Sequence, residues 1–331
     1  MRQLPEAPPP PRDVRAMFAS AERHGLSGVV LDAWRARGFD LPADLARRLE
    51  ALSLARAIDH DAHLALLGRI DARFAEASLP AAALKGPLFA ERFYARPSSR
   101  ATSDLDLLVR EADLDRAASI LADLGFVGVD GAEEPRQRRE HHHLHLSHPD
   151  ALPLELHFRG YAAFGRVLPS EPLVAGRRPA PLAGMSAVGV LGPEDELVFL
   201  AVHAGAHRFV RLGWLYDIDL LTRRMSDAEL RGAKERARVW GFGRVLGFAG
   251  ALLTEVLGAP AARLSALGSG DVGAVRAAIA RWTVGEPRRP IVRASTRLAY
   301  TVALCDDRRA AVRYTMRASG AHARRMLSGR T

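Results

Sequence analysis

The chain has 331 residues, of which 48% are hydrophobic, so it is long enough for two domains and a sizeable core. Its single cysteine, Cys305, excludes a disulfide-stapled secreted protein and indicates a cytoplasmic one. The formal net charge is +9, and residues 261–331 hold 14 arginines against four acidic residues. The longest apolar stretch, 239–257, is interrupted by Arg244 and Glu255, so we expect no membrane span.

The first 78 residues predict a tail followed by helices. Residues 1–12 are rich in proline and lack the apolar run of a secretory signal, so we expect a disordered tail. Residues 13–78 are the expected N-terminal helical region, because apolar side chains recur in 41–77 at helical spacing with charged residues between them.

The pattern changes at residues 79–192 to a compact segment of strands and helices, which is the expected core. The expected elements are, in chain order, a strand at 81–84, a turn at 85–87, a helix at 88–94, a polar loop at 96–103, a strand at 105–109, a helix at 111–124, a strand at 126–129 and a hairpin of 141–146 with 154–158. From Pro193, which is followed by two acidic residues, the pattern is again that of a helix start. Residues 193–331 are therefore the expected C-terminal helical region, which is basic toward its end.

Two carboxylates stand at the beginning of the strongest strand pattern. Asp104 and Asp106 are two residues apart, so in a strand both side chains lie on one face while Leu105 faces the core. Without a basic partner, two neighbouring carboxylates repel each other unless a cation lies between them. Magnesium suits this role, because it prefers oxygen ligands and is bound in phosphoryl-transfer sites by one or two carboxylates plus substrate phosphates. By itself, Asp-x-Asp also fits the edge of a solvated loop.

A basic turn and a basic loop precede this strand. Lys85 and Gly86 end one strand and lead into a helix, where backbone N–H groups can bind phosphate. The chain has two lysines against 45 arginines, so a solvated lysine at this turn indicates a need for a compact ammonium group, with an ordinary surface lysine as the alternative. Arg100 lies four residues before Asp104, in reach of phosphate oxygens.

These segments together resemble a known family. The matching motifs are Leu-Lys-Gly at 84–86, Arg at 100, Asp-Leu-Asp-Leu-Leu-Val at 104–109, Leu-Gly-Phe at 124–126 and Leu-Glu-Leu-His at 154–157. Over 80–158 the chain resembles the uncharacterised bacterial nucleotidyltransferase family of the DNA polymerase β superfamily. The resemblance implies that Gly86 lies at the triphosphate-binding turn and that Glu155 is a third metal-binding acid beside Asp104 and Asp106. Lys-Gly replaces the usual Gly-Ser dipeptide, and 18 positions separate Gly86 from Asp104.

The resemblance implies an α+β fold, with a small mixed-sheet nucleotidyltransferase core flanked by N-terminal and C-terminal helical regions. It also implies transfer of a nucleoside monophosphate from a nucleoside triphosphate, ATP above all, to an unknown acceptor with Mg²⁺ or Mn²⁺. The acceptor is a small molecule, a peptide or protein side chain, or an RNA end. The alternatives are an inactive nucleotide-binding or regulatory module, and an RNA-associated protein that uses its basic C-terminal region.

The expected site has two groups of residues. The metal-binding and catalytic residues are Asp104, Asp106 and Glu155, the last as a metal ligand or as the base toward the acceptor. The nucleotide-binding residues are Lys85, Gly86, Arg100, His143 and His157.

Histidines are concentrated in the expected hairpin. Five of the twelve lie in 141–148, and a turn at 149–151 would place His143 opposite His157 and His145 opposite Glu155. They predict a transition-metal site, or rings that orient Glu155 and contact phosphate, or simply a polar strand face. Downstream, His203 and His207 share one helix face, where we expect helix packing or a substrate-side role, and Asp217 and Asp219 are expected to serve in packing.

Overall fold

The computed structural model describes residues 13–128, 133–268, 294–307 and 309–316. The expected disordered tail at 1–12 lies outside the described residues, as does most of the basic C-terminal segment. Among the residues described, no helix has both the length and the apolar character that a membrane span needs.

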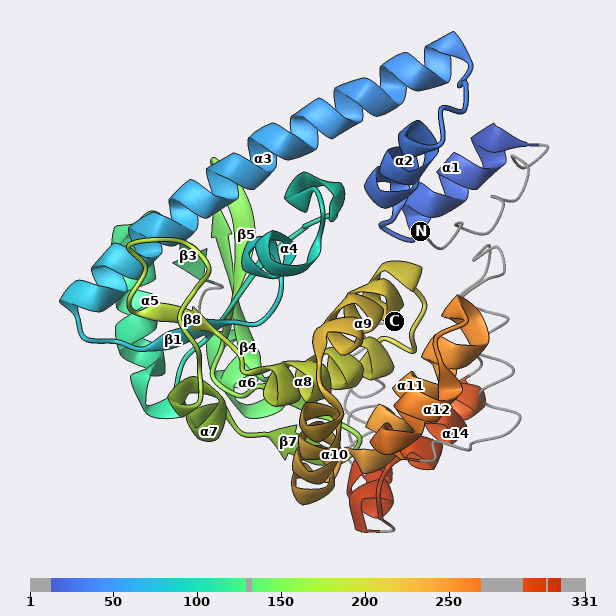
Figure 1. Cartoon of the computed structure of the whole chain (residues 1–331). Helices are drawn as coiled ribbons and strands as arrows, with labels where there is room; N and C mark the ends of the chain where they lie inside the picture. Colours follow the sequence, from blue (N-terminus) through green and yellow to red (C-terminus); the bar gives the residue numbers. More distant parts are fainter. Residues whose placement is uncertain (1–12, 129–132, 269–293, 308, 317–331) are drawn as a thin grey trace.

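Three helices precede the sheet. They are α1 (Val14–Arg23), α2 (Ser27–Ala36) and α3 (Ala43–Glu76). Phe18 of α1, Leu31 and Trp34 of α2, and Leu45 and Leu49 of α3 form a small buried cluster. In Figure 1, α3 runs from this cluster at one end to the sheet at the other, so one long helix joins the two parts.

The centre of the molecule is a six-stranded mixed sheet. Its strands are β1 (Ala81–Ala83), β2 (Leu105–Leu108), β3 (Val127–Gly128), β4 (His143–His148), β5 (Ala151–His157) and β8 (Val188–Val190). They lie in the order β3-β4-β5-β2-β1-β8, with β2 parallel to β5 and antiparallel to β1. A separate antiparallel pair is formed by β6 (Tyr161–Ala163) and β7 (Arg166–Leu168). The predicted α+β class, with a small mixed sheet between helical regions, is confirmed.

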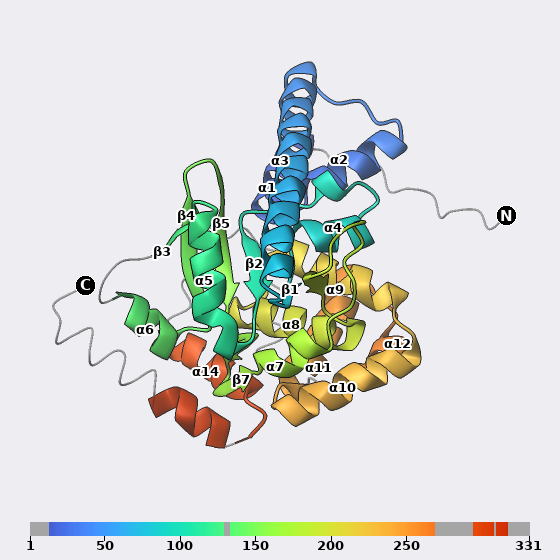
Figure 2. The ribbon, with the colours of Figure 1, turned by 90° about the vertical axis from the view of Figure 1, so that its left-hand side faces the viewer.

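Alternation of side chains gives the sheet two different faces. Leu105 and Leu107 of β2 and Leu154 and Leu156 of β5 lie on one face, in a buried cluster with residues of α3 and of α5 (Leu114–Asp123). Figure 2 shows α3 and α5 in front of this face. Because neighbouring residues of a strand face opposite ways, the polar residues between these leucines lie on the other face.

The other face is covered by the C-terminal helices and by α4 (Pro87–Phe93). These helices are α8 (Pro193–Ala206), α9 (Leu212–Arg224), α10 (Asp227–Trp240), α11 (Gly243–Leu257), α12 (Ala261–Leu264) and α14 (Ala294–Leu304). Among the described residues, their apolar side chains form the largest buried cluster, which also takes in Leu108 of β2 and Leu84 just after β1. Further helical elements are the 3-10 turns η1 (Pro97–Ser99), η2 (Glu111–Asp113) and η3 (Ser265–Leu267) and the helices α6 (Glu133–Glu140) and α7 (Ser170–Ala175), and residues 309–316 are helical as well.

Candidate active site

Strand pairing brings the predicted acidic and histidine residues together on the face opposite α3 and α5. Asp106 of β2 pairs with Glu155 of the parallel strand β5. In the β4–β5 hairpin, His143 pairs with His157 and His145 with Glu155. The predicted register of the hairpin is confirmed, and Glu155 shares a sheet face with Asp106.

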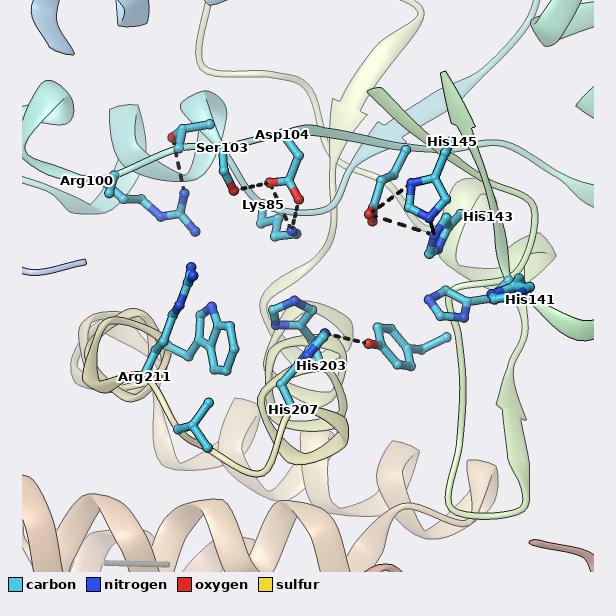
Figure 3. Close-up of a pocket in the computed structure, with 17 residues that line it drawn as sticks. Lys85, Arg100, Ser103, Asp104, His141, His143, His145, His203, His207 and Arg211 are labelled. Carbon is cyan, nitrogen blue, oxygen red and sulfur yellow. Dashed lines mark hydrogen bonds and ion pairs between the residues drawn. The ribbon is translucent and has the colours of Figure 1, made fainter. Parts of the chain in front are cut away.

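A cavity of about 600 Å³ lies between this face and helices α8 and α9, within the range of small-molecule sites. Its lining residues are Lys85, Arg100, Ala101, Thr102, Ser103, Asp104, His141, His142, His143, His145, Glu155, Tyr161, His203, His207, Val210, Arg211 and Trp214. We call Lys85, Asp104, His143, His145 and Glu155, together with the buried Asp106 directly behind them, the sheet wall, and His203, His207, Arg211 and Trp214 the helical wall. Figure 3 shows the two walls facing each other.

Lys85 lies between the two aspartates of the sheet wall. Its Nζ is 3.2 Å from Asp104 Oδ2 and 3.0 Å from Asp106 Oδ2. Burial works to lower the pKa of Lys85, but the charges of Asp106 and Asp104 outweigh it and raise that pKa. The expectation of a solvated lysine and of carboxylates without a basic partner is therefore wrong, because the Lys85 side chain is only 12% exposed and its ammonium contacts both carboxylates.

Glu155 divides its two oxygens between different partners. Oε2 faces His157 Nε2 at 3.4 Å, and His157 also reaches Asp106 Oδ1 at 3.2 Å. Oε1 lies 3.6 Å from His145 Nδ1 and 3.8 Å from His143 Nε2. Burial would raise the pKa of Glu155, but the hydrogen bond from His157 and the nearby positive groups outweigh it and lower that pKa. Asp106, Glu155 and His157 each offer one possible ligand atom, and these three atoms lie within 4.8 Å of one another. A metal ion could bridge atoms at this spacing.

Arg100 is fixed by a residue far away in the sequence. Its Nη2 donates to Asp217 Oδ2 at 2.8 Å, and Tyr94 donates to Asp217 Oδ1 at 2.7 Å. Asp217 belongs to α9, so its expected packing role takes the form of a buried ion pair that joins α9 to the loop before β2. The Nη1 group of Arg100 makes a long hydrogen bond of 3.5 Å to Thr102 Oγ1, and a ligand in the cavity could replace this weak contact.

Three predicted site residues lie behind the cavity lining. Asp106 and His157 are buried, with 2% and 1% of their surfaces exposed, and each contacts a residue that does line the cavity. Gly86 has a φ of +79°, a left-handed backbone conformation that favours glycine, and it directly precedes α4. The structure thus brings Lys85, Arg100, Asp104, His143 and Glu155 to the cavity, and Asp106, His157 and Gly86 lie directly behind them.

The helical wall carries uncharged rings and one arginine. Burial lowers the pKa of both His203 and His207, so both rings are neutral near pH 7. The His207 ring lies 5.2 Å from the Trp214 ring, and its Nε2 is 3.2 Å from the hydroxyl of Tyr161. Arg211 points across the cavity toward Arg100 (Figure 3). The i, i+4 spacing of His203 and His207 indicated a shared face, but Tyr161 and Arg211 had no sequence signal.

Two further histidines line the cavity beside Glu155. Burial lowers the pKa of His143 to about 3, and it lowers the pKa of His142 further still, each helped by the neighbouring imidazoles. Both rings are therefore neutral. His142 stacks against Tyr161 with ring centroids 4.1 Å apart, and it was not among the predicted site residues.

Comparison with known proteins gives the family. The solution structure of the antibiotic-resistance factor ANT(2'')-Ia is similar at a TM-score of 0.40 and 16% identity, over 54% of this chain and 92% of that chain, which is too remote to bear on activity. No curated protein matches the chain. Residues 10–258 match the family described as uncharacterised nucleotidyltransferase, and the chain belongs to that family, as its motifs predicted.

Proposed function

We propose that the chain transfers a nucleoside monophosphate from a nucleoside triphosphate, ATP above all, to an acceptor bound in the same cavity. The observation that carries the proposal is the convergence of Asp104, Asp106 and Glu155 on one sheet face beside a cavity of about 600 Å³. We place the reaction in the cytoplasm, in keeping with the buried, unpaired Cys305.

The donor set fits a hard divalent cation. Asp104, Asp106 and Glu155 offer only carboxylate oxygens, and a cationic group, the ammonium of Lys85, already lies between the first two. These three residues would hold Mg²⁺ or Mn²⁺, which when bound would offset the negative charge of the phosphates. The lowered pKa of Glu155 makes its carboxylate a weak proton acceptor, so we favour the metal-ligand role for Glu155 over the role of base.

The basic residues then bind the triphosphate. Lys85 has a flexible stem, so its ammonium can move from the aspartates to phosphate oxygens when a metal and nucleotide enter. Arg100 stays in place because Asp217 holds it, and Arg211 approaches from the opposite side of the cavity. In the reaction, the acceptor nucleophile loses its proton to solvent and forms a bond to the α-phosphorus, the bond from that phosphorus to the oxygen bridging the α- and β-phosphates breaks, and pyrophosphate leaves.

The same lysine also supports the second candidate, an inactive nucleotide-binding module. If the Lys85 ammonium stays between Asp104 and Asp106, it takes the position of the metal and no transfer follows. The two candidates differ in one measurable property, since only the enzyme releases pyrophosphate in a magnesium-dependent way.

The test is incubation of the full chain with each nucleoside triphosphate, Mg²⁺ and candidate acceptors of the three classes: small molecules, peptides or proteins, and RNA ends. Mass spectrometry reads the mass of an added nucleotidyl group, and a coupled assay reads pyrophosphate. Asp104→Asn is the control, because it keeps the shape of the side chain and removes its charge. Binding of ATP by calorimetry without product or pyrophosphate for any acceptor class would support the inactive module.

A further inference from the structure

Three histidines pack ring against ring beside the carboxylates. The ring centroids of His142 and His143 are 4.5 Å apart, those of His143 and His157 are 5.0 Å apart, and those of His142 and His157 are 5.3 Å apart. One nitrogen of each ring lies within 4.8 Å of one nitrogen of each of the others. Rings that bind one tetrahedral ion through bonds of about 2.0–2.1 Å have centroids roughly 5 Å apart, so the three rings already have the spacing of a metal site.

The hydrogen bonds of these rings leave nitrogens free. His157 uses Nε2 toward Asp106 and Glu155, and His143 uses Nε2 toward His145 Nε2 at 2.9 Å. The Nδ1 atoms of His143 and His157 are buried and have no hydrogen-bond partner in the part of the chain that the structure describes. His157 is 1% exposed, and a buried polar atom without a partner destabilises the fold.

A metal ion would explain this arrangement. Histidines that bind a metal through one nitrogen commonly donate the other N–H to a carboxylate, which fixes the ring and its tautomer. In His157, Nε2 makes the contact to the carboxylates of Asp106 and Glu155, and Nδ1 is left for a metal ion. The ligands are imidazoles, which suit zinc and its neighbours in the transition series, whereas Mg²⁺ prefers oxygen.

We propose that His142, His143 and His157 form a tri-histidine site for a transition-metal ion of the zinc class, in addition to the carboxylate site beside it. Three protein ligands leave a fourth position of a tetrahedral ion open, the arrangement found in reactive rather than purely structural zinc sites. His142 and His143 line the cavity, so an ion and a further ligand can reach the site from there. The two sites share only Asp106 and Glu155, which would orient His157.

A neighbouring set, His143, His145 and Glu155, is the competing location. One ligand atom of each also lies within 4.8 Å of the others. His145, however, is 54% exposed in its side chain, and this set leaves the buried Nδ1 of His157 without a partner. The unpartnered nitrogens therefore favour the tri-histidine set.

The experiment uses the full chain without an affinity tag, stripped with a chelator and then titrated with Zn²⁺ by calorimetry. We expect one tight Zn²⁺ per chain, and Co²⁺ in its place should give the intense visible absorption of a tetrahedral ion. His142→Ala should weaken Zn²⁺ binding by about 100-fold or more, since losing even a supporting contact of a metal ligand costs about 10- to 100-fold.

Two variants serve as controls. His148→Ala removes a histidine of the same hairpin that stacks on Phe126 instead, and it should leave the Zn²⁺ affinity unchanged. Asp104→Asn should abolish magnesium-dependent transfer yet keep the zinc, so the two proposals fail separately. Circular dichroism checks the fold, and His142→Gln replaces His142→Ala if the alanine variant unfolds. The proposal is overturned if the chain binds no Zn²⁺ tightly, or if both His142 variants keep the wild-type Zn²⁺ affinity. It is also overturned if His145→Ala loses Zn²⁺ affinity and the His142 variants do not.

Discussion

The two walls of the cavity differ in how their polar groups are neutralised. On the sheet wall, Lys85, Asp104 and Glu155 are charged and contact oppositely charged or hydrogen-bonding neighbours within 4 Å. On the helical wall, His203 and His207 are neutral because burial lowers their pKa values, and they pack against Trp214. With a divalent cation on its carboxylates, the sheet wall would suit the phosphates of a ligand, and the uncharged rings of the helical wall suit a flat, uncharged part.

The walls are held together by buried ion pairs between the sheet region and the C-terminal helices. Arg100 of the loop before β2 pairs with Asp217 of α9, and Arg92 of α4 pairs with Glu196 of α8. Asp217 and Glu196 are both almost fully buried. The relative position of the walls thus depends on a few charged residues as well as on apolar packing.

The largest effect on activity is expected from the sheet wall. Asp106→Asn should lower magnesium-dependent transfer by about 10²- to 10³-fold or more, because a group that stabilises developing charge in a dry site typically contributes that much. The coupled pyrophosphate assay measures it. Asp123→Asn is the control, since Asp123 is 66% exposed on α5, across the sheet. Equal rates of transfer in Asp106→Asn and the wild type would show that Asp106 has no role in the reaction.

Among these variants, breaking the Arg100–Asp217 ion pair between the walls should lower the stability of the fold most. Asp217→Ala leaves the Arg100 guanidinium buried without its partner and removes the acceptor of the Tyr94 hydroxyl. We expect the free energy of unfolding to fall by about 3–5 kcal/mol, as for other broken buried pairs. Urea denaturation followed by circular dichroism measures the change.

Asp219→Ala, two residues along the same helix, is the matched variant for this link. Its partner Arg223 is 64% exposed, so no buried cation is left behind and the loss should be about 1 kcal/mol or less. Similar losses in the two variants would show that the Arg100–Asp217 pair has no special part in joining the walls.

The sequence predicted the sheet wall better than the helical wall, for a physical reason. Strict alternation in 143–146 and 154–157 predicts which residues share a face, and the expected turn at 149–151 predicts the pairing of His143 with His157. That Asp106 and Glu155 share a face follows from the same alternation once their strands are neighbours. The family motifs lie in the same strands. Both kinds of information act over short distances in the chain.

Contacts between distant segments could not be predicted in this way. Arg100 and Asp217 are 117 residues apart, and nothing local to either marks the partner. Lys85 reaches the aspartates because β1 pairs with β2, which places Leu84 beside Asp106. The three alanines of β1 give no sequence signal from which this pairing could be predicted. Strands β6, β7 and β8, each of three residues, were also missed, since so short a run shows no periodicity. Strand β1 is equally short, but the Lys-Gly-Pro turn that follows it marked its end in the sequence.

A smaller effect, on binding, should separate the two candidate roles of Lys85. Lys85→Met should weaken ATP binding by about 10- to 100-fold, the value of a hydrogen bond to a charged group, and should strengthen Mg²⁺ binding without nucleotide because Asp104 and Asp106 lose their bound cation. Calorimetry measures both. Lys234→Met, at the exposed second lysine on α10, should change neither. Unchanged ATP affinity with stronger Mg²⁺ binding would favour the inactive module.

The smallest expected effect tests the helical wall itself, and it depends on the ligand. Trp214 lies against His203 and His207 at ring-centroid distances of 5.2 Å, and Arg211 lies over its face at 5.5 Å, so the indole is an edge of the cavity on which a nucleobase could stack. Stacking of a base on an aromatic side chain contributes about 1–3 kcal/mol. Trp214→Ala should therefore weaken binding of ATP by about tenfold and leave binding of inorganic tripolyphosphate unchanged, because tripolyphosphate has no ring to stack on the indole.

Trp240→Ala is the matched control for Trp214→Ala. Trp240 ends α10 away from the cavity lining, and Arg236 lies over its ring at 5.9 Å, much as Arg211 lies over Trp214. It should leave both affinities unchanged. Lys85→Met, by contrast, should weaken ATP and tripolyphosphate alike, since its contact is with the phosphates. If Trp214→Ala weakened both ligands equally, the two walls would not divide the ligand between phosphate and base. Loss of a stacking surface alone cannot weaken the binding of a ligand that carries no ring.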